Sequence, residues 1–165
     1  MKYRLVGILS VGHLATDINQ GSIAALLPFL ISEHDLSYAA AAAVVFASNI
    51  ASTFVQPIFG YTADRFFKPW LLPLGLLLAG FGLALTGLVP SYRLIILVAV
   101  ISGMGVAAYH PQAARLVNLA AGNKKATAMS LFGVGGTLGF AIGPLFITFS
   151  LLYWGLKGTF VLMVP

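Results

Sequence analysis

The fold is decided by a short charged stretch, Gly60-Tyr61-Thr62-Ala63-Asp64-Arg65-Phe66-Phe67-Lys68, which lies between two long uncharged runs. No Asp, Glu, Lys or Arg occurs from Leu36 to Ala63 or from Pro69 to Tyr92. Runs of about 18 or more apolar residues are typical of helices that cross a membrane. Because a soluble core helix does not need an uncharged run of this length, the stretch is predicted to be a tight, charged hinge between two membrane spans.

The overall composition indicates the same class of protein. Of the 165 residues, 59% are hydrophobic and 8% are charged, whereas soluble domains carry about 25% charged residues. Such a chain cannot cover a water-exposed surface, so the lipid bilayer is its expected partner. The absence of cysteine excludes disulfides and thiolate metal sites. The net charge of +5 comes from basic residues scattered at the ends of apolar runs, so no nucleic-acid partner is expected.

The chain is predicted to be an all-α membrane protein with five full spans and the start of a sixth. Helix is the only open-chain solution, because lipid does not satisfy exposed backbone groups. Thr159 to Pro165 is seven residues, whereas a span needs about 20, so residues 1–165 are predicted to be the N-terminal half of a longer protein. The five full spans are roughly Leu5–Ile31, Tyr38–Tyr61, Trp70–Val89, Leu94–Ala114 and Ala126–Leu152, and the sixth begins at Thr159.

The basic residues predict that the N-terminus lies in the cytoplasm. With that orientation, seven basic residues are cytoplasmic and two lie outside, in keeping with the positive-inside rule. The cytoplasmic set is Lys2, Arg4, Arg65, Lys68, Arg115, Lys124 and Lys125, and the outer set is Arg93 and Lys157.

The first span contains polar residues that a purely structural membrane helix does not need. His13, Asp17 and Gln20 share one helical face at i, i+4 and i+7. Asp17 lies about 18 Å along the helix, near mid-membrane, where an aspartate costs about 2.5–3.5 kcal/mol on insertion scales. A cost of this size suggests a carboxyl that loads and unloads a proton, although a hydrogen-bonded Asp that ties helices together is the alternative.

The second span carries a weaker polar stripe. Asn49, Ser52 and Gln56 lie at i, i+3 and i+7. The amides of Asn49 and Gln56 are candidates for lining a solute path, and the alternative is that they hold helices together by hydrogen bonds.

The fourth span ends in Tyr109-His110-Pro111, close to the predicted inner surface. His110 is a candidate proton relay or substrate contact. It is expected to approach His13 in the cytoplasmic half if the first and fourth helices are neighbours.

The fifth span contains Gly135, Gly139 and Gly143, which recur every four residues and are followed by Pro144. This doubled GxxxG face permits very close approach of a neighbouring helix. The two interpretations are static packing and a face about which two halves of the protein rock.

The charged stretch resembles the signature between the second and third helices of the major facilitator superfamily, Gly-x-x-x-Asp-Arg-x-x-Lys/Arg. Phe67 stands where a glycine is usual. The resemblance implies a conformational latch in which Asp64 docks at the N-terminal end of a helix of the other half, where the helix dipole favours an anion. The latch residues are Gly60, Asp64, Arg65, Lys68 and Arg115.

Further motifs are similar to those of the fosmidomycin-resistance type of exporter. Gly139-x-x-x-Gly143-Pro144 resembles part of the fifth-helix signature of drug/proton antiporters, whereas Ala99 stands where their fourth helix usually carries arginine. The closer matches are His13-Leu14-x-x-Asp17, Gln56-Pro57-x-x-Gly60-Tyr61, Pro69-Trp70-x-x-Pro73-x-Gly75 and Tyr109-His110-Pro111-x-x-x-Arg115.

The resemblance implies proton-coupled efflux of a small drug-like molecule from a bacterial inner membrane, by alternating access of two six-helix halves. The expected partners are lipid, protons, a small-molecule substrate and the C-terminal half. The alternatives are a solute importer of the same superfamily and a truncated half that is inactive alone. No enzyme, cofactor or metal site is predicted, because the sequence has no nucleophile elbow, no His-Glu-x-x-His and no metal-spaced ligand cluster.

Overall fold

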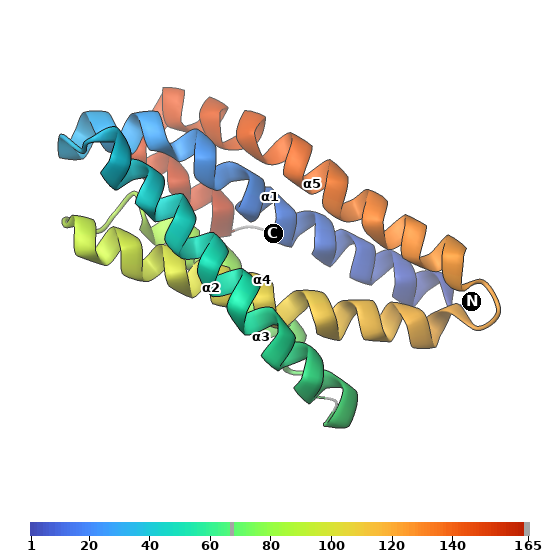
Figure 1. Ribbon diagram of the computed structural model, residues 1–165. Helices are drawn as coiled ribbons and strands as arrows, with labels where there is room; N and C mark the ends of the chain where they lie inside the picture. The colour runs from blue at the N-terminus through green and yellow to red at the C-terminus, as the bar shows by residue number, and fades with distance from the viewer. Residues whose placement is uncertain (67, 164–165) are drawn as a thin grey trace.

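The computed structural model describes residues 1–66 and 68–163. Five α-helices follow one another along the chain and lead into a 3₁₀ helix, η1 (Figure 1). Length and apolar composition make α1, α2, α4 and the continuous segment Lys125–Met163 candidate membrane spans. The elements are α1 (Tyr3–His34), α2 (Tyr38–Arg65), α3 (Leu71–Leu85), α4 (Tyr92–Ala121), α5 (Lys125–Trp154) and η1 (Gly155–Met163).

The charged stretch is helical over most of its length, which corrects the prediction of a hinge. Residues Gly60 to Arg65 form the last turns of α2, and the backbone N–H of Phe66 still donates to the Thr62 carbonyl at 2.7 Å. No proline follows Pro57 before the end of this helix, so its backbone hydrogen bonds continue past the last apolar residue. Phe67 lies outside the described residues.

The third helix is shorter than predicted. α3 has 15 residues, which is about 22 Å and less than the roughly 30 Å hydrocarbon core of a bilayer. Its backbone passes into turns at Thr86 and Leu88, and Gly87 and Pro90 follow, both of which disfavour continued helix.

The fourth helix is longer than predicted, because it continues through Pro111 to Ala121. Proline is tolerated inside a membrane helix where neighbouring groups satisfy the freed backbone. The extension places His110 about 17 Å from the end of α4 at 1.5 Å per residue, well inside the bundle rather than close to its surface.

The predicted start of a sixth membrane helix at Thr159 is not confirmed in the part of the chain that the structure describes, which forms a 3₁₀ helix there. Gly155 ends α5 with a positive φ of 57°, a backbone conformation that favours glycine. The following residues form η1, which packs against α5 and α3. The Thr159 hydroxyl donates to the Ala84 carbonyl at 2.6 Å, which ties η1 to the end of α3.

The helices pack as two main pairs. α1 lies alongside α5, and α2 packs against α4, whose other side receives α3 (Figure 1). The N-terminus lies at the end of the bundle where α4 passes into α5, and the backbone N–H of Lys2 donates to the Ala120 carbonyl at 2.8 Å. One apolar core, around Leu26, Leu83 and Ile147, joins α1, α3 and α5, together with α2, α4 and η1.

Close packing of α1 on α5 depends on glycines of α5. A Cβ placed on Gly135, Gly139 or Gly143 would overlap the backbone of α1. Across the same contact, the Ser22 hydroxyl of α1 lies 2.9 Å from the Gly143 carbonyl oxygen of α5 and 2.6 Å from the Ile18 carbonyl oxygen of its own helix, so its single proton is shared between the two. The carbonyl groups of α1 that these three glycines face are those of Ser10, Leu14 and Ile18, respectively.

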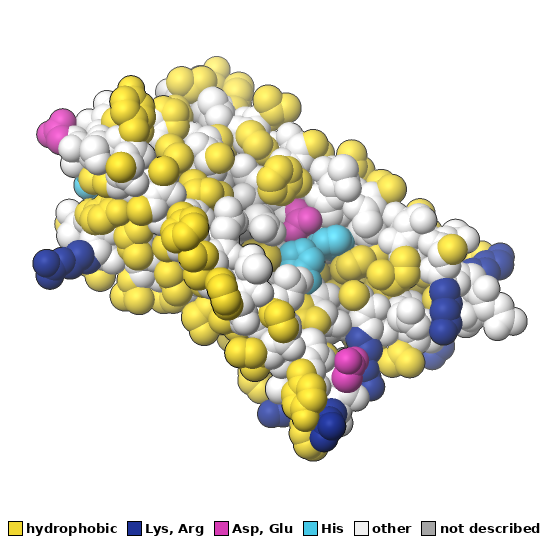
Figure 2. Space-filling model, in the orientation of Figure 1, with side chains coloured by type: hydrophobic (Ala, Val, Ile, Leu, Met, Phe, Trp, Pro, Cys, Tyr) yellow, Lys and Arg dark blue, Asp and Glu magenta, His cyan; other side chains and the backbone are white. Residues whose placement is uncertain are grey.

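The outer surface of the bundle is rich in large apolar side chains, and Figure 2 shows them spread over most of the visible face, with Lys and Arg gathered toward its ends. This distribution suits a lipid environment. Examples from α2 and α5 are Phe46, Phe54, Leu138, Leu145, Phe149 and Leu152.

Candidate functional site

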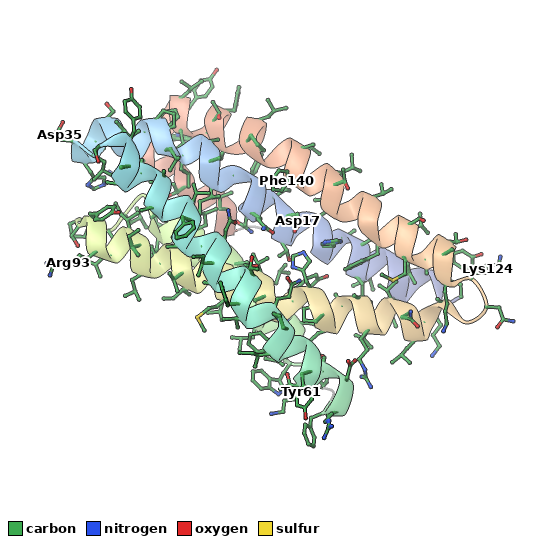
Figure 3. The ribbon with its side chains drawn as sticks, in the orientation of Figure 1. Asp17, Asp35, Tyr61, Arg93, Lys124 and Phe140 are labelled. Carbon is green, nitrogen blue, oxygen red and sulfur yellow. The ribbon has the colours of Figure 1, made fainter. Side chains whose placement is uncertain are left out.

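Three ionisable side chains meet in the middle of the bundle, and they come from two helices. Asp17 and His13 lie one turn apart on α1, and His110 comes from α4. A carboxylate oxygen of Asp17 lies 3.1 Å from Nε2 of His110, and its other oxygen lies 3.3 Å from Nε2 of His13. Figure 3 shows Asp17 midway along α1, and Figure 2 shows an acidic and a histidine patch in contact at that level. We call these three residues the His–Asp–His cluster.

Both imidazoles are held in place by the backbone. Nδ1 of His13 lies 2.8 Å from the carbonyl oxygen of Phe132 on α5, and Nδ1 of His110 lies 2.8 Å from that of Val106 on its own helix. The His13 ring also stacks on the Phe132 ring, with centroids 4.0 Å apart, and meets the His110 ring edge-on at 4.8 Å. The rings therefore have little freedom to turn away from Asp17.

The approach of α1 and α4 beside the cluster is fixed by Tyr109. Its hydroxyl donates to the Leu9 carbonyl at 2.8 Å. A Cβ on Gly12 would overlap that hydroxyl, so any other residue there would displace the Tyr109 side chain. Because Tyr109 and His110 are consecutive, this contact sets the depth at which His110 meets His13 and Asp17.

A cavity of about 550 Å³ opens beside the cluster, between α1 and α5. The side chains of His13 and Asp17 are 11% and 14% exposed, respectively, so the cluster is largely desolvated but is still reached from this cavity. Figure 3 shows Phe140 of α5 close to Asp17. The described lining is His13, Asp17, Gly133, Gly136, Thr137, Phe140 and Ala141.

The cluster is also a group of potential ligands that spacing along the sequence does not reveal. One ligand atom from each of His13, Asp17 and His110 lies within 4.8 Å of the others, a spacing that one metal ion is able to bridge. The same atoms are equally able to share protons. Local sequence spacing misses the group because its third member is 93 residues from Asp17.

The predicted amides do not line the cavity beside Asp17. Asn49 is exposed on α2, whereas Gln20 and Gln56 are half-buried, and none of the three belongs to the described lining of the cavity. The two fully buried amides are instead Asn19 and Gln112, and Gln112 has no hydrogen-bond partner among the described residues. A buried amide among small apolar neighbours gives no periodic signal, so neither residue was predicted as a site residue.

The predicted latch residues divide into two groups. Gly60, Asp64 and Arg115 line one cavity of about 430 Å³, where the ends of α2 and α4 meet. Arg65 and Lys68 are exposed, and the Arg65 guanidinium lies 4.8 Å from the centre of the Tyr61 ring.

Three residues that support the cluster were not predicted as site residues. The Phe132 carbonyl oxygen accepts a hydrogen bond from His13, and the Phe132 ring stacks on the imidazole. The Tyr109 hydroxyl bonds to α1 and so positions the adjacent His110. A Cβ on Gly136 would lie 2.6 Å from Nε2 of His13 and 2.7 Å from a carboxylate oxygen of Asp17, so the cluster needs a glycine there. An aromatic or a glycine in an apolar helix is too common for the sequence to single out.

An ionisable cluster inside a bundle of long apolar helices defines a multi-pass membrane protein with a polar site at its centre. Residues 9–165 match the Major Facilitator Superfamily model, so the chain belongs to this family, whose members are secondary transporters.

Two curated relatives resemble the chain. It is 34% identical over 143 residues to the fosmidomycin resistance protein of Escherichia coli (strain K12), covering 87% of the chain and 35% of that protein. It is 31% identical over 156 residues to the uncharacterized MFS-type transporter YfnC of Bacillus subtilis (strain 168), covering 94% of the chain and 38% of that protein. The chain therefore spans little more than a third of the length of these relatives.

Proposed function

We propose that the chain is the N-terminal half of a proton-coupled exporter of a small drug-like molecule such as fosmidomycin. The carrying observation is the His–Asp–His cluster, which lies beside a cavity at the middle of apolar helices. Ionisable groups at this depth are costly and mark ion or substrate pathways. The 34% identity to a fosmidomycin resistance protein supports drug efflux.

In this proposal Asp17 exchanges the coupled proton, and His13 and His110 tune or relay it. Protonation favours one orientation of the cavity and the substrate favours the other, so that each biases an equilibrium between two states. The rocking requires a C-terminal half, toward which Asp64 closes as a latch. The glycine face of Gly135, Gly139 and Gly143 moves with α1 as one packed unit.

The test is accumulation of fosmidomycin in sensitive bacteria that express the protein. An exporter lowers accumulation in a manner that depends on the proton gradient, and Asp17→Asn abolishes the gradient dependence. Asp35→Asn is the matched control, because it makes the same chemical change at an exposed left-handed position where asparagine is well tolerated. Unchanged coupling in the Asp17→Asn protein would refute the assignment of Asp17.

The same measurement separates the alternatives. A solute importer of this superfamily raises accumulation instead of lowering it. A half that is inactive alone changes nothing until the C-terminal half is co-expressed.

We further propose that the protein lies in a bacterial inner membrane with its N-terminus in the cytoplasm, which the bias of basic residues favours. The chain has no cysteine, so single Lys124→Cys and Lys157→Cys variants report one position each, and both lysines are exposed. An impermeant maleimide added to spheroplasts is expected to label position 157 and to reach position 124 only after permeabilisation. The opposite labelling pattern would show that the N-terminus lies outside the cytoplasm.

A further inference from the structure

The atoms that face one another inside the His–Asp–His cluster are all hydrogen-bond acceptors unless extra protons are present. The reason begins with Nδ1 of each imidazole. Its partner is a backbone carbonyl oxygen, at 2.8 Å for both His13 and His110. A carbonyl oxygen only accepts hydrogen bonds, so Nδ1 must carry the proton in each ring.

A neutral imidazole has one N–H. With that proton on Nδ1, Nε2 of each ring presents a lone pair to Asp17. The carboxylate also only accepts when ionised. The two Nε2–oxygen contacts, at 3.3 Å for His13 and 3.1 Å for His110, therefore each need a proton of their own.

We infer that the His–Asp–His cluster binds two exchangeable protons, one in each Nε2–carboxylate contact, while both Nδ1 atoms stay protonated throughout. The two contacts use different oxygens of Asp17, so the two protons do not compete for one site. The number of protons follows from the contacts within the cluster. Only the use of those protons in transport rests on the proposed function.

The number of protons sets the charge of the cluster. With none it carries one negative charge, with one it is neutral, and with two it carries one positive charge. The neutral state is the one suited to a sealed bundle, because isolated charge is costly away from water. The other two states need the water-accessible space of the cavity along Gly133, Gly136 and Thr137.

Among the described residues, the other ionisable groups of the helices around the cluster lie mostly toward the helix ends. On α4, the ionisable residues nearest to His110 in sequence are Tyr109, whose ring centroid lies 6.2 Å from that of His110 and whose hydroxyl donates to a backbone carbonyl, and Arg115, five residues further on. On α1, Arg4 lies near the start of the helix. α5 has Lys125 and Tyr153 near its two ends, and α3 has no ionisable side chain. The ionisable groups of α2 lie in its first and last turns: Tyr38, Tyr61, Asp64 and Arg65.

The test is nuclear magnetic resonance of the 165-residue chain in lipid nanodiscs, with ¹⁵N-labelled histidine and a chelator that removes metal ions. Ring ¹⁵N shifts report directly which nitrogen carries a proton. From alkaline to acidic pH, we expect the Nδ1 signals of His13 and His110 to stay protonated, and both Nε2 signals to change from bare to protonated. His34 lies at the far end of α1, and a His34→Gln variant identifies its signals and serves as the control.

A second measurement counts the protons. Proton uptake after an acid jump, followed with a pH indicator, is expected to fall by one proton per chain in His13→Gln and by one in His110→Gln. In the His34→Gln control, uptake falls only by the proton that His34 itself binds, and the two protons of the cluster remain. The inference is overturned if either Nδ1 is bare in the neutral ring, or if only one of the two Nε2 atoms gains a proton. These two measurements do not depend on transport. If two protons are counted but the efflux assay fails, the exporter proposal is refuted and the inference about two protons is retained.

Discussion

Replacing Gly139 by alanine tests whether the glycine face of α5 sets the packing of the bundle. A Cβ at this position would overlap the Leu14 carbonyl oxygen and would lie 2.9 Å from its carbon and 3.0 Å from the Ile18 nitrogen. All three are backbone atoms of a helix, which cannot turn aside as a flexible side chain can. Relief therefore requires α5 and α1 to separate, which also weakens the Ser22 hydrogen bond across the contact.

The matched control is Gly133→Ala, on the same helix. A Cβ there meets nothing within 4 Å. Both variants gain the same intrinsic helix propensity, about 1 kcal/mol at most, so this term cancels when they are compared. The difference isolates the overlap, and forcing a methyl group into a packed contact costs about 1–3 kcal/mol.

The assay is unfolding of the purified chain in mixed micelles of dodecyl maltoside and dodecyl sulfate, followed by far-ultraviolet circular dichroism. We expect Gly133→Ala to unfold at or above the dodecyl sulfate fraction of the parent chain. Gly139→Ala should unfold earlier, by an amount equivalent to about 1–3 kcal/mol. If the two variants were equally stable, close contact between α1 and α5 would not determine the packing.

Three further outcomes follow from single contacts. Ser22→Ala should lose about 0.6 kcal/mol of stability in the same assay, because this fully buried hydroxyl divides its one proton between the Gly143 carbonyl of α5 and the Ile18 carbonyl of its own helix; an unchanged midpoint would show that the contact with α5 contributes nothing. Thr159→Val keeps the shape but removes the 2.6 Å bond to Ala84, so hydrogen exchange of η1 should rise while that of α1 stays constant. Gly136→Ala places a methyl group against His13, so the ¹⁵N signals of that ring should shift, and an unmoved spectrum would contradict the packing described.

The spans were predictable because their signal is local. Long uncharged runs fix where apolar helices occur, and α1, α2, α4 and α5 lie close to the predicted ranges. Their ends were less predictable. α2 continues through Asp64 and Arg65 and α4 continues through Pro111 and Arg115, since a helix ends where its backbone bonds end rather than where hydropathy falls. The 3₁₀ helix at Gly155 depends on a positive φ and on contacts with α3, neither of which hydropathy registers.

The site was predictable in part. Helical spacing alone placed His13 and Asp17 on one face, and the cost of burying an aspartate marked that face for function. The expected approach of His110 depended on α1 and α4 being neighbours, which no local pattern establishes. The amides of Gln20, Asn49 and Gln56 carried the same kind of polar signal as the two histidines, but lie outside the described lining of the cavity.

The sequence by itself determined the class of protein, where its long apolar helices occur and the presence of ionisable groups within the first of them, because hydropathy and helical periodicity are properties of neighbouring residues. Only the tertiary structure decided which of those groups meet. A carboxylate of α1 faces two imidazoles whose Nδ1 atoms are bound to backbone carbonyls, one of them on α5. Those carbonyls fix where the ring protons lie: the Val106 carbonyl belongs to the helix of His110, whereas the Phe132 carbonyl reaches His13 because glycine contacts bring α5 close to α1.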